Sequence, residues 1–344
     1  MATVPNDYRW YELGLPEGRG WTAADTKRLT DRLPARAEGV VTDAVWGLSR
    51  QSAGLYYRFR TDATELSARW TLPDGPVGLP HMPPSATSGL DLYAEDDHGR
   101  LRWASWAAPE EGGGTTTKVL LSGIRGMDGL REYRLYLPLH NQPDDVSVGV
   151  PESARLEILE ADRTPSVAYY GTSIVHGIAA SRSGMAMPAQ LGRRLDRPVI
   201  GLGFSGNAKM EVELADLFAE LDPAVYLIDC LPNMSAEQVA ERAEPFVRRL
   251  RDAHPTTPIL LIEDRTLANA WIRTGQLADH RARRAELADA YRILRGEGDT
   301  NLHYLAHDHL LGDDDEGTVD SSHPTDLGFT RMVDILEPVV RALL

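Results

Sequence analysis

The sequence predicts a two-domain chain in which a β-sandwich precedes a three-layer α/β domain built on a parallel sheet. Residues 1–155 contain short alternating runs between Pro, Gly and Asp clusters, together with six of the seven tryptophans, a pattern typical of a sandwich. Residues 156–344 alternate short apolar runs with amphipathic segments, as expected of parallel strands covered by helices. The length of 344 residues also favours two domains, since one domain typically has about 150 residues.

Six runs in the first domain mostly alternate between apolar and polar side chains, which indicates strands with one buried face. They lie at residues 55–60, 66–72, 101–106, 117–121, 133–137 and 146–148. The triple glycine Gly112–Gly114 predicts a hairpin loop. The long Pro- and Gly-rich connection at residues 73–84 is expected to fold over a neighbouring surface.

Five apolar runs in the second domain predict the strands of the parallel sheet. They lie at residues 167–170, 198–202, 225–228, 259–262 and 302–305. Helical spacing of apolar residues predicts helices at 210–221 and 332–343, and Ser235 with Gln238 forms a capping-box start for another. Because ligands of such domains bind outside the carboxyl ends of the strands, functional residues are expected there.

Polar residues follow the first three strands of this sheet and precede the last helix. Ser173 lies in a strand-to-helix turn, where its hydroxyl is exposed and its N–H suits developing negative charge, although an N-cap serine would fit equally well. Gly206 lies in the turn after the second strand, and Asn233 follows the third. Asp320 and His323 come directly before the C-terminal helix.

Together these segments resemble the SGNH, or GDSL-type, serine hydrolase superfamily. The resemblance implies a flavodoxin-like catalytic domain in which Ser173 is the nucleophile and His323 the general base and then acid. It also implies that Asp320 orients His323. The oxyanion would be bound by the N–H groups of Ser173 and Gly206 and by the side-chain amide of Asn233.

The resemblance covers residues 164–344, and Asp-x-x-His-Pro before the last helix is its most specific part. Thr172 and Ile174 replace the Asp and Leu of the name-giving Gly-Asp-Ser-Leu block. Asn233 lacks the Gly and Asp that usually flank it. A histidine suits the proton exchange with a serine because its unperturbed pKa is near neutral, at about 6.5.

The segment Gly89-Leu90-Asp91-Leu92-Tyr93 resembles the short signature of a β-sandwich that precedes one branch of this superfamily. In that branch the sandwich is similar to carbohydrate-binding jelly rolls, so the resemblance implies a jelly-roll-like domain that helps to shape the acyl or alcohol pocket. The residues alone equally fit a turn entering a strand.

Three further residues are candidates for the pocket: Thr172, His176 and Arg265. His176 lies on the helix of the nucleophile, so it is poorly aimed to act as the base and is expected in the pocket wall. Arg265 either lines the pocket or pairs with its neighbours Glu263 and Asp264.

No metal or other cofactor is expected. His303, His307 and His309 lie near the acidic run at 313–316, which favours a solvated loop over a metal site. Residues 201–206 match the Gly-x-Gly-x-x-Gly fingerprint of dinucleotide sites. An NAD(P)-dependent oxidoreductase is therefore an alternative, although the hydrolase interpretation already requires a glycine turn at this place.

Composition restricts the partners and the compartment. The formal net charge of −15 repels phosphate backbones and argues against nucleic acid. The single cysteine, Cys230, excludes an intrachain disulfide and fits a reducing compartment. Residues 1–8 lack the features of an export signal, and no apolar run is long enough for a membrane span. A cytoplasmic protein without membrane contact is therefore predicted.

The function predicted from these patterns is a serine-dependent acyl-ester hydrolase that forms an acyl-Ser173 intermediate. Its expected substrate is a small ester, such as an acylated sugar, a glycosylated compound or another metabolite. An acyltransferase that passes the acyl group to an alcohol of a metabolite is one alternative. A non-catalytic sugar-binding protein is another. The sequence does not determine the acyl chain, the acceptor or the oligomeric state.

Overall fold

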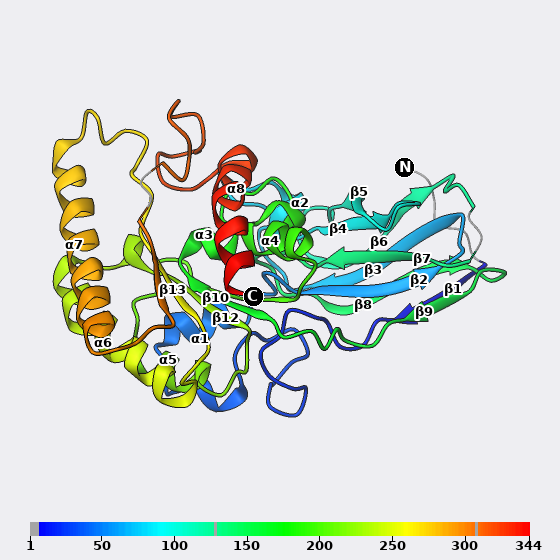
Figure 1. The fold of residues 1–344 in the computed structure, drawn as a ribbon. Coiled ribbons are helices and arrows are strands. Elements are labelled where there is room, and N and C mark those ends of the chain that lie inside the picture. Colours follow the sequence, from blue (N-terminus) through cyan, green and yellow to red (C-terminus); the bar gives the residue numbers. More distant parts are fainter. Residues whose placement is uncertain (1–6, 127–128, 307–308) are drawn as a thin grey trace.

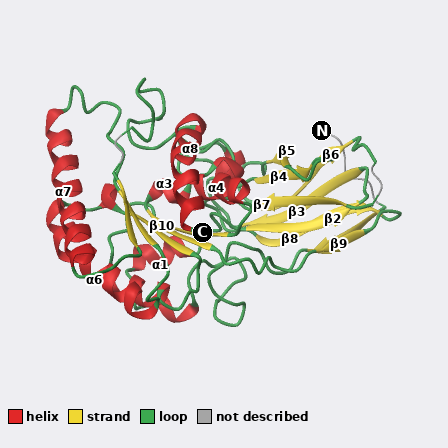
Figure 2. Ribbon diagram, viewed as in Figure 1, coloured by secondary structure: helices red, strands yellow, loops and turns green. Residues whose placement is uncertain are grey.

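The computed structural model describes residues 7–126, 129–306 and 309–344. Two predictions concern residues outside these ranges. One is the lack of an export signal, which involves residues 1–6, and the other is the solvated loop, which includes His307. A sandwich of antiparallel sheets lies beside an α/β domain, and helix α8 (Asp326–Leu343) lies near the junction (Figures 1 and 2). The predicted fold class is therefore confirmed. Across the described ranges, no helix is both long and apolar enough to span a membrane.

The sandwich consists of a four-stranded sheet in the order β1-β8-β3-β6 and a five-stranded sheet in the order β5-β4-β7-β2-β9. Their bounds are β1 (Tyr8–Glu12), β2 (Tyr56–Thr61), β3 (Glu65–Leu72), β4 (Leu90–Glu95), β5 (Leu101–Ala107), β6 (Gly114–Ser122), β7 (Arg131–Tyr136), β8 (Asp144–Pro151) and β9 (Leu156–Ile158). The inner faces share one core, in which Phe59, Trp70 and Leu135 are completely buried. All six predicted strands are present.

The hairpin predicted at Gly112–Gly114 is wrong. Strand β5 belongs to one sheet and β6 to the other, so the glycines carry the chain between the sheets. Gly113 has a φ of +81°, and a Cβ there would lie 2.5 Å from the carbonyl oxygen of Pro73. Local sequence cannot distinguish such a crossing from a hairpin, because both need the same left-handed backbone.

The second domain has a parallel sheet in the order β11-β10-β12-β13-β14, which is the flavodoxin-like order. All five predicted strands are present, as β10 (Val167–Gly171), β11 (Val199–Gly203), β12 (Val225–Asp229), β13 (Ile259–Ile262) and β14 (Leu302–Leu305). One face packs against α3 (Ser173–His176), α4 (Met187–Leu195) and α8. The other packs against α5 (Val212–Phe218), α6 (Ala236–Ala253) and α7 (Thr274–Gly296). The capping box at the start of α6 is present.

The segment between β1 and β2 leaves the sandwich and packs against the α/β domain. Its helix α1 (Asp43–Ser49) and the buried Trp21 and Leu33 join the core that contains Leu202 and Phe218. In Figure 1, α1 lies beside α5, below the parallel sheet. The domain division at residue 155 stays a prediction, but this packing joins an early part of the chain to the core of the second domain.

Candidate active site

The candidate nucleophile lies where β10 turns into the short helix α3. Gly171 permits the sharp turn, because a Cβ there would lie 2.4 Å from Val175 Cγ2 and 2.7 Å from the carbonyl oxygen of Asp229. Thr172 is the N-cap, and its side chain accepts a hydrogen bond from the N–H of Ile174. Thr172 is therefore buried within the turn and does not line a pocket. Ser173 follows as the first helical residue and is partly exposed.

Ser173, His323 and Asp320 form one hydrogen-bonded series. Ser173 Oγ lies 2.9 Å from His323 Nε2, and His323 Nδ1 lies 2.7 Å from Asp320 Oδ2. The other oxygen of Asp320 accepts from the backbone N–H groups of Ser322 and His323, at 3.0 and 2.7 Å. Burial alone would raise the pKa of Asp320, but the hydrogen bonds from His323 outweigh it and hold the pKa below its usual value. Asp320 is thus suited to remain an anion beside the imidazole.

Arg265 holds the loop that carries this histidine. Its Nε and Nη2 donate to the carbonyl oxygen of Ser322 at 3.1 and 2.9 Å, and Nη2 also donates to Ser322 Oγ at 2.6 Å. The side chain is almost completely buried, so the structure does not place it on a pocket wall. Ser322 is the backbone neighbour of His323, and Arg265 therefore acts on the site through the loop.

Three carboxylates surround Arg265, and two of them, Asp229 and Asp264, are buried. Burial lowers the pKa of Arg265, while the negative charges of Asp264, Asp229 and Asp320 raise it. Burial raises the pKa of Asp229 to about 7, against the opposing attraction of Arg265. Asp264 also accepts hydrogen bonds from Arg283 and Arg284, both at 3.0 Å, on helix α7. The loop that carries His323 is therefore anchored to a charged network that extends to α7.

The expected oxyanion donors lie on the two neighbouring turns. Gly206 is exposed after β11 and has a φ of +72°, a conformation that costs glycine little. The side-chain oxygen of Asn233 accepts from the N–H groups of Asn207 and Ala208 at 3.1 and 3.2 Å. The reverse orientation would set the amide nitrogen against those two donors. In this orientation Nδ2 is the donor of the Asn233 side chain.

The glycine run at 201–206 has a packing explanation. A Cβ on Gly203 would lie 2.2 Å from the backbone nitrogen of His176, so glycine permits helix α3 to approach β11. The backbone carbonyls of Gly201 and Gly203 accept hydrogen bonds at 3.1 and 2.8 Å from Arg32, which is fully buried. Burial lowers the pKa of Arg32 to about 9. Strand β11, which leads to Gly206, is thus held by a side chain from the segment between β1 and β2.

His176 is not brought to the reacting atoms. It is completely buried, and its Nε2 lies 2.9 Å from the carbonyl oxygen of Leu139. Its ring stacks on His140, with centroids 4.9 Å apart. Burial, followed by the positive charge of Arg32, lowers the pKa of His176 well below its usual value. The expectation of a pocket-wall residue is therefore not met, because the sandwich covers this side of α3.

The Gly-x-Asp-Leu-Tyr segment also lies at the contact between the domains. Asp91 is completely buried and accepts from the N–H of Gly184 at 2.7 Å and from Arg182 Nη1 at 2.9 Å. The hydroxyl of Tyr93 accepts from the same Arg182 nitrogen at 2.6 Å. Gly89 admits no side chain, because a Cβ would lie 2.5 Å from the carbonyl oxygen of Ala107. In this structure the motif therefore joins the sandwich to the segment between α3 and α4.

His81 is a site residue that the sequence did not predict. It lies in the connection at 73–84, which was expected to cover a neighbouring surface. The ring centroids of His81 and His323 are 5.8 Å apart. The sandwich thus contributes an exposed side chain beside the imidazole of His323. No local signal identifies such a residue, since the contact joins positions far apart in the chain.

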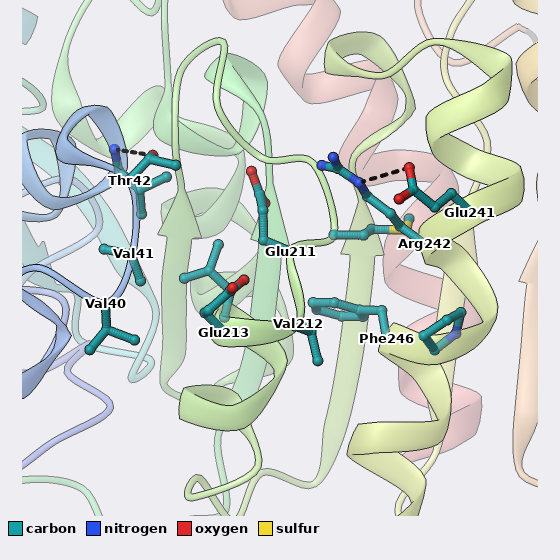
Figure 3. Close-up of a pocket in the computed structure, with 13 residues that line it drawn as sticks. Val40, Val41, Thr42, Glu211, Val212, Glu213, Glu241, Arg242 and Phe246 are labelled. Atoms are coloured by element: carbon teal, nitrogen blue, oxygen red, sulfur yellow. Dashed lines mark hydrogen bonds and ion pairs between the residues drawn. The ribbon is translucent and has the colours of Figure 1, made fainter.

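A separate groove of about 420 Å³ lies between α1, α5 and α6. Figure 3 shows Glu211 and Arg242 on its walls, with none of the three catalytic candidates among its residues. Glu211 accepts hydrogen bonds from the Lys209 N–H and the Tyr170 hydroxyl, at 3.1 and 3.3 Å. Glu211, a residue of the groove wall, therefore ties the segment after Gly206 to strand β10. Within the described ranges, no group of three or more His, Cys, Asp or Glu side chains is arranged to hold a metal ion.

Comparison with known proteins agrees with this geometry. Residues 164–341 match the family model of GDSL-like lipases/acylhydrolases, and residues 8–156 match that of the N-terminus of SGNH-hydrolase-type esterases. A GDSL-like lipase from Bacteroides ovatus is 32% identical, with a TM-score of 0.91 over 98% of each chain. No match is found among curated proteins.

Two more distant solved structures share the fold. A salicylyl-acyltransferase from a tetracycline biosynthetic pathway is 19% identical, with a TM-score of 0.78 over 99% of this chain and 98% of the other. A family two carbohydrate esterase from Clostridium thermocellum is 12% identical, with a TM-score of 0.59 over 84% of this chain and 92% of the other. From the family match over residues 164–341 and the full-length similarity to the Bacteroides ovatus protein, this chain belongs to the GDSL-like lipase/acylhydrolase family.

Proposed function

We propose that the protein hydrolyses carboxylic esters through an acyl intermediate on Ser173. The observation that carries this proposal is the series of hydrogen bonds from Ser173 Oγ to His323 Nε2, at 2.9 Å, and from His323 Nδ1 to Asp320 Oδ2, at 2.7 Å. A serine hydroxyl is a weak nucleophile until a base within hydrogen-bond reach accepts its proton. Both separations lie within that reach.

Acylation begins when Ser173 Oγ attacks the ester carbonyl carbon and His323 Nε2 accepts the hydroxyl proton. Asp320 holds the Nδ1–H of His323, which keeps Nε2 as the acceptor and stabilises the imidazolium. The carbonyl oxygen becomes an oxyanion and receives hydrogen bonds from Ser173 N–H, Gly206 N–H and Asn233 Nδ2. His323 then donates its proton to the leaving alcohol as the carbon–oxygen bond breaks.

Deacylation repeats the sequence with water as the nucleophile. His323 accepts a proton from water, the water oxygen attacks the acyl carbon, and Ser173 recovers its proton as the acid leaves. The side chains of His323 and Asp320 are 24% and 45% exposed, so water can approach the imidazole. This accessibility supports hydrolysis over transfer to an alcohol, which requires a site that excludes water.

The proposed substrates are small esters whose alcohol is a sugar or another hydroxylated metabolite. The net charge of −15 disfavours anionic polymers and is compatible with neutral esters. The described site offers hydrogen-bonding side chains at its rim, among them His81 and Asn233. Solved carbohydrate esterases share the fold at low identity, which makes acetylated sugars a sensible first panel.

Replacing the nucleophile tests the proposal. Ser173→Ala and His323→Ala should reduce turnover of p-nitrophenyl acetate to background while leaving the circular dichroism spectrum unchanged. Ser153→Ala, which removes an exposed serine near the end of the sandwich, is the matched control and should retain activity. A fluorophosphonate should label the wild type and Ser153→Ala but not Ser173→Ala. Retained turnover in Ser173→Ala would exclude the acyl-Ser173 mechanism.

The balance between hydrolysis and transfer can be measured on the same intermediate. With a fixed acyl donor and increasing concentrations of a sugar alcohol, the free acid should remain the main product. If the new ester predominated at millimolar alcohol, the protein would be an acyltransferase that uses the same residues.

A further inference from the structure

The connection between β3 and β4 is held between the rest of the sandwich and the α/β domain. Its short helix α2 (Pro84–Thr87) is fixed by Ser85 Oγ, which donates to the carbonyl oxygen of Ser181 at 2.6 Å. The N–H of Leu139 donates to the carbonyl oxygen of Ala86 at 2.9 Å. Met82 is 1% exposed and belongs to the same core cluster as Ile174 of helix α3. The connection therefore has a defined position relative to the nucleophile.

The tip of this connection is a tight turn that presents His81. Leu79 and Met82 exchange backbone hydrogen bonds of 2.9 and 3.0 Å, so Pro80 and His81 are the two residues of the turn. The ring of His81 is exposed, and its centroid lies 5.8 Å from that of His323. In the described ranges no hydrogen bond is formed by the His81 ring, whereas both ring nitrogens of His323 are already engaged. His81 thus keeps its donor and its acceptor for a ligand.

The position of His81 relates it to one side of the substrate. In the proposed reaction His323 Nε2 protonates the leaving oxygen, so the alcohol part of the ester must lie against the imidazole of His323. A neutral imidazole donates through one nitrogen and accepts through the other. The alcohol portion can therefore bond to His81 if it carries a second hydroxyl near the ester oxygen, whereas a simple alkyl or aryl alcohol cannot.

We infer that His81, supplied by the sandwich domain, is a specificity residue that binds a hydroxyl group on the alcohol part of the ester. The inference rests on the proposed hydrolase function and deepens it, since it names polyhydroxylated alcohols as the substrate class. The sandwich then forms one wall of the alcohol subsite. The acyl group lies on the other side of the reacting carbon and is independent of His81.

The experiment compares two acetate esters that share one acyl-enzyme. One is an acetylated methyl glycoside and the other is p-nitrophenyl acetate. His81→Ala should lower kcat/KM for the glycoside acetate about tenfold, the effect of losing one hydrogen bond to the substrate, and should change p-nitrophenyl acetate turnover less than twofold. His81→Gln, which keeps a donor and an acceptor, should recover part of the loss. His98→Ala, at an exposed turn of the same sandwich, is the matched control and should leave both values unchanged.

The outcomes separate this inference from the proposed function. An equal loss for both esters in His81→Ala would overturn the inference, because His81 would then act only on His323. Unchanged kinetics for both esters would overturn it as well. In either case Ser173→Ala would still be inactive if the hydrolase proposal holds. Activity remaining in Ser173→Ala would refute the hydrolase proposal independently of His81.

Discussion

Substitution of Asn233 by aspartate should separate catalysis from folding at the proposed oxyanion site. When the amide of Asn233 is oriented to match its neighbours, its side-chain oxygen accepts from the N–H groups of Asn207 and Ala208, at 3.1 and 3.2 Å. Asp has the same shape and keeps an acceptor for both donors. It replaces the Nδ2–H donor with a second oxygen, which would repel the developing oxyanion. Asn233→Ala, in contrast, removes both the donor and the acceptor.

The magnitudes follow from these two contacts. Loss of one oxyanion donor typically reduces kcat about 10²- to 10³-fold, or roughly 3–4 kcal/mol, and both variants should show at least this loss. Ala208 is completely buried, so leaving its N–H without an acceptor should lower the free energy of unfolding of Asn233→Ala by about 1–3 kcal/mol. Asn233→Asp should remain close to the wild type in stability.

The assay is steady-state hydrolysis of p-nitrophenyl acetate at neutral pH, combined with urea unfolding followed by tryptophan fluorescence. If Asn233→Asp retained kcat within threefold of the wild type, Asn233 would not be an oxyanion donor. If Asn233→Asp were as unstable as Asn233→Ala, the side-chain oxygen would not be the atom that anchors the turn. Each result refutes a different step of the reasoning.

Three further predictions concern the packing around the site. Arg265→Lys keeps the charge but loses the forked hydrogen bonding to Ser322. In steady-state kinetics kcat should therefore fall about ten- to a hundredfold with little change in KM. An unchanged kcat would contradict the anchoring role of Arg265. Asp91→Ala leaves Arg182 without its buried carboxylate, so the free energy of unfolding measured in urea should fall by about 3–5 kcal/mol. A fall below about 1 kcal/mol would argue that the contact between the domains at Asp91 does not stabilise the protein. Burial lowers the pKa of His140 from 6.5 to about 4, so the unfolded chain binds this proton first as the pH falls. His140 should therefore lower the free energy of unfolding by up to about 3 kcal/mol from pH 6.5 to 4. His140→Gln should lack this contribution and retain that of His176, whose pKa is also lowered by burial.

The parallel sheet and the catalytic candidates could be predicted from the sequence because their signals are local. Each buried strand is a short apolar run, and the turn that follows it carries the functional residue within a few positions. Ser173, Gly206 and Asn233 lie at such strand ends. Asp320 and His323 are three residues apart on one loop, so the hydrogen bond between them needs only local geometry.

The pocket candidates show where local signals end. Thr172 and His176 lie within three residues of Ser173 in sequence, but both are buried. His176 contacts Leu139, which comes from the end of the sandwich domain. Arg265 could equally have paired with its acidic neighbours or lined the pocket, and the structure instead directs it to Ser322. A buried polar side chain takes the partners that surround it in space, and its neighbours along the chain do not reveal them.

The sequence by itself determined the fold class, a β-sandwich followed by an α/β domain. It also determined which strands end in polar residues and that four segments resemble one superfamily. Only the tertiary structure decided how the first third of the chain serves the second domain. Arg32 donates a hydrogen bond to Gly203, 171 positions away. The ring of His81 lies beside that of His323, and Asp91 accepts a hydrogen bond from the segment after α3. The physical reason is that strand and turn signals depend on a few adjacent residues. Burial of a charge or a domain contact depends on atoms that the folded chain brings together from distant positions.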